Sequence, residues 1–122
     1  MSENRSLTQS SKILIVEDQL DLAETIADSL EGFDTTIAVN GKEASEYLAV
    51  NDIDLVITDI MFPGGGGERV LNELSTRDIP TVVYTGQPAG RKQDFTLLGA
   101  NEVIFKTQEI AVLVSAVKRL LD

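Results

Sequence analysis

The sequence contains no cysteine and no histidine, and only ten of its 122 residues are lysine or arginine. Without cysteine, a disulfide framework, a thiol nucleophile and a cysteine-based metal site are excluded. Without histidine, no imidazole is available as a general base, a metal ligand or a carrier of phosphohistidine. Any chemistry of this chain therefore depends on carboxylates, hydroxyls, lysine ammonium groups and the backbone.

Basic residues are outnumbered by twenty aspartate and glutamate residues, which gives a formal net charge of −10. A field of that sign repels a phosphate backbone, so we expect no direct nucleic-acid partner. No apolar run approaches the ~20 residues that a membrane span needs, so we expect no membrane association. The first eleven residues lack the hydrophobic core of an export signal, and we therefore expect a cytoplasmic protein.

The length fits one domain. Residues 1–11 are rich in polar residues and predict a flexible N-terminal tail, and residues 12–122 predict the folded domain. Short apolar runs predict strands at Lys12–Val16, Thr35–Val39, Asp54–Thr58, Thr81–Tyr84 and Val103–Phe105. Amphipathic stretches predict helices at Leu20–Leu30, Lys42–Ala49, Arg69–Leu74, Lys92–Leu98 and Ile110–Leu121.

This alternation of strands and helices predicts an α/β fold with a parallel sheet covered on both faces. Ligands of such doubly wound sheets bind beyond the carboxyl ends of the strands. Glu17 and Asp18 follow the first predicted strand, Asp59 follows the third, Thr85 the fourth and Lys106 the fifth. In a parallel arrangement, three carboxylates, a hydroxyl and an ammonium group are expected to converge on one rim.

Three carboxylates at one rim repel one another unless a cation joins them, and oxygen ligands suit a hard cation, above all Mg²⁺. A carboxylate can also be the nucleophile that forms an aspartyl phosphate. A lysine, a hydroxyl and backbone N–H groups then neutralise charge on the transferring group. Each residue alone has an ordinary structural interpretation, such as a helix N-cap for Asp18 or a turn residue for Asp59. Their joint occurrence at four strand ends favours phosphoryl chemistry.

The same strand ends carry sequence blocks that resemble the receiver domains of two-component signalling, over essentially all of residues 12–122. The matching blocks are KILIVED at 12–18, DLVITDIMFPG at 54–64, VVYTG at 82–86 and VIFK at 103–106. The resemblance implies a flavodoxin-like (βα)5 receiver fold, in which two helices cover one face of a five-stranded parallel sheet and three cover the other. It further implies a response regulator of the single-domain type that takes part in a phosphorelay.

The resemblance also implies a role for each residue at the rim. It implies Asp59 as the phosphoacceptor, Thr85 as the switch hydroxyl and Lys106 as the group that holds the phosphoryl oxygens. The implied Mg²⁺ ligands are Glu17 (directly or through water), Asp18, Asp59 and the backbone carbonyl of Met61.

Three departures from the family pattern bear on how such a domain switches. Thr107 stands where the family usually has proline, and Val103 stands where it usually has a tyrosine or phenylalanine that rotates with the threonine on phosphorylation. Tyr84 and Phe105 are candidates to replace that ring. Gly64–Gly67 replaces a loop that usually carries more side chains, and we interpret it as a flexible connector rather than a segment that orders on docking.

Three functions from different classes are open at this point. The leading one is a phosphoacceptor that is not an enzyme, although it assists its own phosphoryl transfer and dephosphorylation. Its donor is expected to be a histidine kinase, a phosphotransfer protein or a small phosphodonor, and its output an unknown protein. The alternative is a pseudo-receiver adaptor that binds partners without phosphorylation-driven switching, which Val103 and Thr107 favour. An aspartyl-phosphate phosphatase is disfavoured, because Met61 stands where those enzymes carry a second aspartate.

Overall fold

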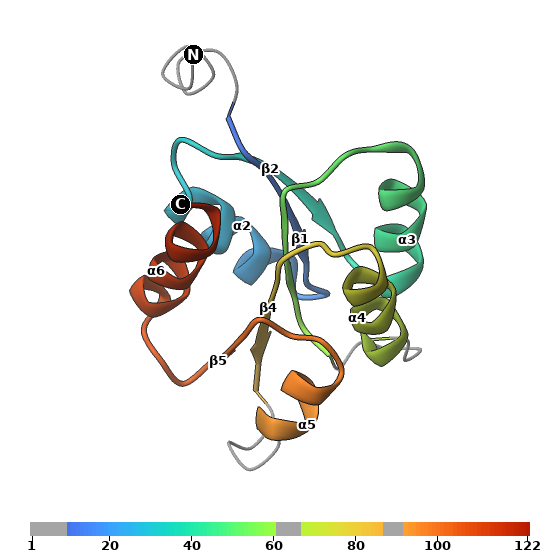
Figure 1. The fold of residues 1–122 in the computed structure, drawn as a ribbon. Helices are drawn as coiled ribbons and strands as arrows, with labels where there is room; N and C mark the ends of the chain where they lie inside the picture. The colour runs from blue at the N-terminus through green and yellow to red at the C-terminus, as the bar shows by residue number, and fades with distance from the viewer. Residues whose placement is uncertain (1–9, 61–66, 87–91) are drawn as a thin grey trace.

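The computed structural model describes residues 10–60, 67–86 and 92–122, which form a five-stranded sheet between two layers of helices (Figure 1). The strands are β1 (Lys12–Val16), β2 (Asp34–Ala38), β3 (Leu55–Thr58), β4 (Thr81–Thr85) and β5 (Glu102–Phe105). The helices are α2 (Leu20–Ser29), α3 (Gly41–Val50), α4 (Gly67–Thr76), α5 (Lys92–Leu97) and α6 (Ile110–Leu121). Strands and helices alternate along the chain, as the sequence predicts.

All neighbouring strands pair in parallel, in the order β2-β1-β3-β4-β5. The chain runs from β1 outward to β2 and then returns past β1 to β3, so the sheet has its topological switch point between β1 and β3. Val16 is opposite Thr58 at the carboxyl ends of these two strands. A crevice at a switch point is where doubly wound sheets bind their ligands. Glu17 and Asp59 are therefore the first residues after the two strands that border it.

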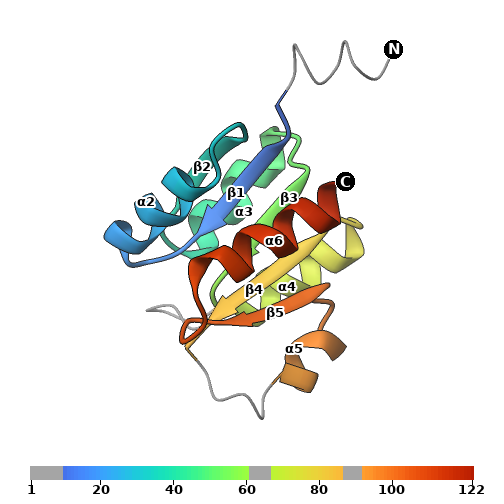
Figure 2. The same ribbon diagram turned by 90° about the vertical axis from the view of Figure 1, so that its left-hand side faces the viewer.

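Alternation along the strands divides their apolar side chains between two helical layers. Ile13 and Ile15 of β1 pack in a cluster with residues of α2 and α6, whereas Leu14 and Val16 pack with residues of α3 and α4. Figure 2 looks onto the α2 and α6 layer, and α3, α4 and α5 cover the other face. Burial on both faces explains why these strands appear in the sequence as continuous apolar runs.

The bounds of β1 and α6 are those predicted, and the other elements differ by a few residues. Helix α4 extends beyond the predicted Arg69–Leu74 at both ends and begins at Gly67. The low helix propensity of glycine hides this start in the sequence. Gly67 is thus helical rather than part of a connector, and residues 64–66 lie outside the described part of the chain. Thr85 is the last residue of β4 and not the first residue beyond it.

Only Ser10 and Ser11 of the predicted tail are described by the structure. The Ser11 carbonyl accepts a hydrogen bond from Asp34 N at 2.9 Å, which joins it to the start of β2. Residues 1–9, to which most of the tail prediction applies, lie outside the described residues. None of the described helices has the length and apolar character needed to cross a membrane.

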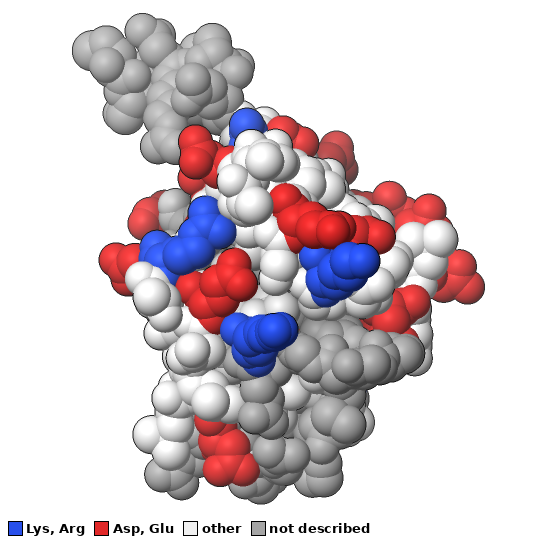
Figure 3. All heavy atoms as spheres, turned by 90° about the vertical axis from the view of Figure 1, so that its right-hand side faces the viewer, with Lys and Arg blue, Asp and Glu red and all other residues white. Residues whose placement is uncertain are grey.

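The face that carries α3 and α4 displays acidic and basic side chains interspersed (Figure 3). Arg77 follows the last residue of α4, and its Nη1 lies 4.0 Å from Oε2 of Glu73, four residues earlier. Such exposed pairs contribute little to stability. The basic side chains visible on this face are separated by acidic ones.

Candidate functional site

The predicted site residues lie where four strands end at one rim of the sheet. Glu17 and Asp18 follow β1, Asp59 follows β3, Thr85 ends β4 and Lys106 follows β5. Backbone hydrogen bonds fix these ends relative to one another. Asp59 N donates to the Val16 carbonyl at 3.0 Å, and Lys106 N donates to the Thr85 carbonyl at 2.8 Å. The parallel ladder thus extends one residue past the strands and carries the site residues with it.

Lys106 joins two of the three carboxylates. Its Nζ lies 2.7 Å from Asp59 Oδ2 and 2.9 Å from Glu17 Oε1. Glu17 is 2% exposed and Asp59 is 6% exposed. Buried carboxylates of this kind are tolerated only when a counter-charge and hydrogen bonds replace water, and the ammonium group supplies the counter-charge.

The remaining oxygen of each buried carboxylate is held by a backbone amide. Ile60 N donates to Asp59 Oδ1 at 2.6 Å, and Gln19 N donates to Glu17 Oε2 at 3.1 Å. Gln19 is the N-cap residue of α2, so the helix start and the carboxylate fix each other. Each acidic side chain therefore has one oxygen on Lys106 and the other on the main chain, which holds both in a single orientation.

Asp18 differs from its two neighbours because its side chain is exposed. Carboxylate oxygens of Glu17, Asp18 and Asp59 nevertheless all lie within 4.8 Å of one another. A set of three oxygen ligands at this spacing, open to solvent on one side, suits a hard divalent cation. Met61, the fourth ligand implied by the sequence resemblance, lies outside the described residues.

The pKa shifts at the site follow from burial and from the lysine. Burial raises the pKa of Glu17, although the hydrogen bond from Lys106 and its positive charge oppose that shift. Burial alone would lower the pKa of Lys106, but hydrogen bonds to Asp59 and Glu17 outweigh it and the pKa is raised. Lys106 is therefore firmly protonated at neutral pH. Three carboxylates share the rim with one ammonium group, so the formal charge of the site is −2, which a divalent cation would neutralise.

Strand alternation separates the two aromatic residues considered as replacements for the missing ring at Val103. Phe105 is opposite Thr85 in the β4–β5 register and packs against the cluster beneath α5. Tyr84 instead belongs to the cluster formed with α2 and α6, on the other face of the sheet. Of the two, only Phe105 shares a face with Thr85.

The Lys106–Glu17 ion pair is a feature that sequence reasoning missed. The sequence pattern indicates only at which strand end each group lies. The family resemblance implies that Lys106 binds phosphoryl oxygens, and it implies no contact between Lys106 and Glu17. A signal was present, because two carboxylates directly after buried strands need a counter-charge and Lys106 is the ammonium group at the same rim.

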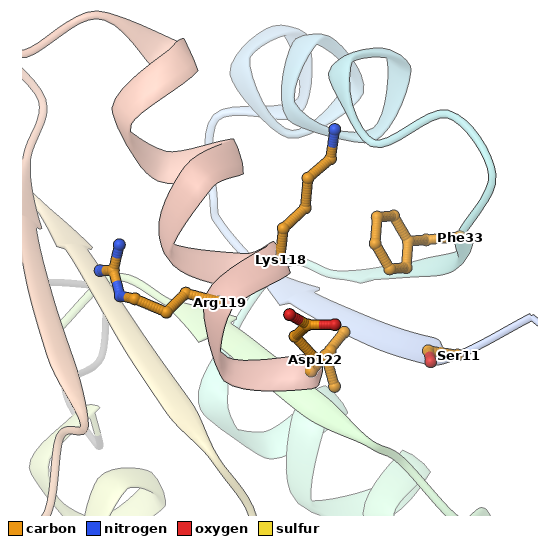
Figure 4. A pocket seen from close by; sticks show the side chains of 6 residues that line it. Ser11, Phe33, Lys118, Arg119 and Asp122 are labelled. Atoms are coloured by element: carbon orange, nitrogen blue, oxygen red, sulfur yellow. The ribbon is translucent and has the colours of Figure 1, made fainter.

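A hollow of about 600 Å³ lies at the amino end of the sheet, opposite the candidate site (Figure 4). It is lined by Ser11, Phe33, Lys118, Arg119, Leu121 and Asp122. Lys118 and Arg119 point away from one another in Figure 4, and Arg119 is paired with Glu102 at 2.9 Å. The lining groups do not converge on a common point, in contrast to those at the carboxyl rim.

A family model described as the response regulator receiver domain matches residues 13–118. Sensory transduction protein RegX3 of Mycolicibacterium smegmatis is 30% identical over 115 residues, which cover 91% of this chain and 50% of RegX3. Response regulator SaeR of Staphylococcus aureus is 32% identical over 114 residues, which cover 89% of this chain and 50% of SaeR. The chain thus spans about half the length of the curated relatives it matches.

The fold also resembles that of solved structures. A crystal structure of the response regulator protein TrrA from Thermotoga maritima, in complex with Mg²⁺ and BeF, is similar with a TM-score of 0.82 and 30% sequence identity. The match covers 91% of this chain and 99% of TrrA. The predicted flavodoxin-like architecture, five parallel strands doubly wound with helices, is thereby confirmed.

Proposed function

The chain belongs to the response regulator receiver domain family, and on that premise we propose that it is a signalling domain phosphorylated on Asp59 beside a bound Mg²⁺. The observation that carries the proposal is the buried Asp59 carboxylate, 2.7 Å from the Lys106 ammonium group at the end of β3. A carboxylate buried in this way is costly for stability alone, and its position beside a cation suits a nucleophile for phosphoryl transfer.

The acidic donor set fits Mg²⁺, and TrrA, at 30% identity, was solved with that ion. We propose that Glu17, Asp18 and Asp59 hold the metal, and that the Met61 carbonyl completes the protein ligands. Their carboxylate oxygens lie within 4.8 Å of one another. When bound, Mg²⁺ neutralises carboxylate and phosphoryl oxygens and keeps water-filled positions for the incoming group.

The protein's own residues do the rest of the chemistry. One Asp59 oxygen forms the bond to phosphorus as the bond from phosphorus to the donor breaks, and the electron pair of that bond leaves with the donor. Ile60 N–H, 2.6 Å from Asp59 Oδ1, holds the carboxylate in orientation. Lys106 exchanges its hydrogen bond to Asp59 for one to a phosphoryl oxygen, and Thr85 supplies the switch hydroxyl at the end of β4. Later attack by water on phosphorus returns Asp59 and inorganic phosphate.

The phosphoryl group comes from outside these 122 residues, since they contain no histidine to carry it. We propose a histidine kinase or a phosphotransfer protein as the donor. We propose that the output is a protein contact, because the net charge of −10 disfavours direct binding of this domain to nucleic acid. The cytoplasmic location inferred from the sequence stays a prediction.

Phosphorylation is tested by intact-mass spectrometry after incubation with acetyl phosphate and Mg²⁺. We expect one phosphoryl group on the native chain and on Asp52→Asn, a matched control at an exposed aspartate near the start of β3. We expect none on Asp59→Asn. Equal labelling of Asp59→Asn and the native chain would show that the acceptor lies elsewhere.

A second candidate function, a pseudo-receiver adaptor, is favoured by one observation. Val103 is buried at 5% exposure and β5 carries no aromatic ring at that position. An adaptor would bind its partner equally well with and without a phosphoryl group. Partner affinity measured before and after phosphorylation separates the two functions, because a switching receiver changes affinity and an adaptor does not.

A further inference from the structure

Strand β5 lies at an edge of the sheet, and the main-chain groups of its last residue face away from the sheet. β5 follows β4 at the end of the strand order, so it has a neighbour on one side. On that side, Lys106 N donates to the Thr85 carbonyl at 2.8 Å. Main-chain groups alternate in direction along a strand, so the N–H and carbonyl of Phe105 point to the open side. They need a partner other than a strand.

Gln108 satisfies both of these outward groups. Its side-chain Oε1 accepts from Phe105 N at 2.9 Å, and its main-chain N–H donates to the Phe105 carbonyl at 2.9 Å. The second bond closes a turn over residues 105–108, in which Lys106 and Thr107 are the central residues. The turn is therefore closed twice, once by the backbone and once by the Gln108 side chain.

The doubly closed turn holds the backbone of Lys106 from the side that β4 leaves open. Lys106 Nζ lies 2.7 Å from Asp59 Oδ2 and 2.9 Å from Glu17 Oε1. To make these contacts, the side chain reaches from the edge strand past β4 to the ends of β3 and β1. A lysine stem is flexible, so its ammonium group stays in one place only where the backbone that carries it is fixed.

The stability of the fold alone does not account for the side-chain bond of Gln108. Gln108 is exposed, and water can replace it as the acceptor for Phe105 N–H at little cost. Thr107 is exposed as well and has no ring to fix its φ, so the shape of the turn depends on its hydrogen bonds. Exposed segments held by few bonds open readily, and opening here would carry Lys106 away from the two carboxylates.

We infer that Gln108 is a positioning residue for phosphoryl transfer, whose side chain holds the turn that keeps the Lys106 ammonium group at Asp59. This inference rests on the proposed function, because Lys106 is the group proposed to bind the phosphoryl oxygens. Gln108 acts through Lys106, and we assign it no contact with the phosphoryl group or the metal. A loss of its side-chain acceptor slows the reaction because Lys106 spends less time in place.

The test is the rate of labelling by acetyl phosphate and Mg²⁺ in two variants of similar side-chain length. Gln108→Met removes the acceptor, whereas Gln108→Glu keeps an oxygen at the position of Oε1. We expect Gln108→Met to label about threefold to tenfold more slowly, the fold change that the loss of one hydrogen bond gives. Gln108→Glu should restore a rate near that of the native chain.

Two further variants separate positioning from a general effect on the loop. Glu109→Gln changes the charge next to Gln108 at an exposed side chain that makes no capping hydrogen bond in the described part of α6, and it should label at the native rate. In a Lys106→Met background, Gln108→Met should slow labelling no further, because the ammonium group through which it acts is gone. Hydrogen exchange at Phe105 N–H should be faster in Gln108→Met than in the native chain, which locates the change at the turn.

The outcomes are distinct. Native labelling rates in Gln108→Met overturn the inference, as do equal losses in Gln108→Met and Gln108→Glu, or a loss of the same size in the Lys106→Met background. A native chain that takes no phosphoryl group overturns the proposed function, and the inference with it. Slow labelling in Gln108→Met that Gln108→Glu restores supports the inference, and this comparison decides on its own if the Lys106→Met chain does not fold.

Discussion

The two ends of the sheet both place polar side chains at strand termini, but they satisfy them differently. At the amino end, Asp54 Oδ2 accepts from Lys12 N at 2.7 Å, and Asn101 Oδ1 accepts from Thr81 N at 2.8 Å. In both cases the same residue returns a hydrogen bond at 2.8 Å, from its own N–H to the carbonyl of its partner. These are reciprocal bridges that tie a loop to the first residue of the neighbouring strand.

At the carboxyl end, each buried carboxylate has one oxygen on the Lys106 ammonium group and the other on a backbone amide. Glu17 and Asp59 are nearly inaccessible to solvent and share the ammonium group of Lys106. Backbone amides satisfy a side-chain oxygen without adding a charge, whereas a buried ion triad needs every member in place. We infer that the amino end serves stability, whereas the carboxyl end is arranged for the proposed phosphoryl chemistry.

The largest effect on stability is expected for Lys106→Met. This change leaves two buried carboxylates without their counter-charge, so we expect the free energy of unfolding to fall by about 3 kcal/mol in the absence of divalent metal. Urea unfolding in EDTA measures it. Phosphorylation by acetyl phosphate should also slow, because the transferring group loses a charge-assisted hydrogen bond in the transition state.

Lys118→Met is the matched control at the opposite end of the sheet, where the lysine is exposed. We expect it to change the free energy of unfolding by less than about 0.5 kcal/mol. A similar, small effect for both lysine variants would contradict the view that Lys106 compensates buried charge.

Addition of Mg²⁺ is expected to have the next largest effect. Binding to the folded state alone stabilises it by roughly 2.7 kcal/mol when the free metal is at a hundred times its dissociation constant, which raises the melting temperature. Asp18→Ala should reduce this gain strongly, since it removes an exposed ligand of the acidic set without disturbing Lys106. Thermal unfolding in Mg²⁺ titrations provides the measurement. An unchanged gain in Asp18→Ala would exclude Asp18 as a ligand.

Apart from the Lys118→Met control, the smallest effect is expected for Asp54→Ala at the amino end. The change removes the solvent-exposed hydrogen bond that Asp54 Oδ2 accepts from Lys12 N, which should lower the free energy of unfolding by about 1 kcal/mol. Mg²⁺ stabilisation and acetyl phosphate labelling should match those of the native chain. Loss of labelling in this variant would show that the two ends of β3 are not independent.

Much of the fold could be predicted from the sequence because its elements are marked by strong local patterns. Lys12–Val16 and Ile110–Leu121 have the predicted bounds, since the first is a continuous apolar run and the second a sustained amphipathic stripe. The start of α4 was missed at Gly67, where tertiary packing overrides a poor helix propensity. The sequence predicts that β4 ends at Tyr84, one residue before its end in the structure, because threonine is common in both strands and turns.

The candidate site could be predicted to the level of which residues share a rim. A parallel sheet fixes the end at which Glu17, Asp59 and Lys106 emerge, and this follows from the order of elements alone. Sequence could not show that Lys106 reaches across to Glu17, since β1 and β5 are separated by two strands and the contact depends on the reach of a long side chain.

The central claim, that Asp59 is the phosphoacceptor, is tested most directly by locating the phosphoryl group within the labelled native chain. Cleavage after Lys42 and Arg69 releases one peptide, residues 43–69, that contains Asp52, Asp54 and Asp59 together. Reduction of the acyl phosphate with borohydride before digestion converts the modified aspartate to homoserine, and fragment ions then identify its position. We predict homoserine at position 59 and unmodified aspartate at 52 and 54. Homoserine at 52, 54 or 18, with aspartate intact at 59, would contradict the account.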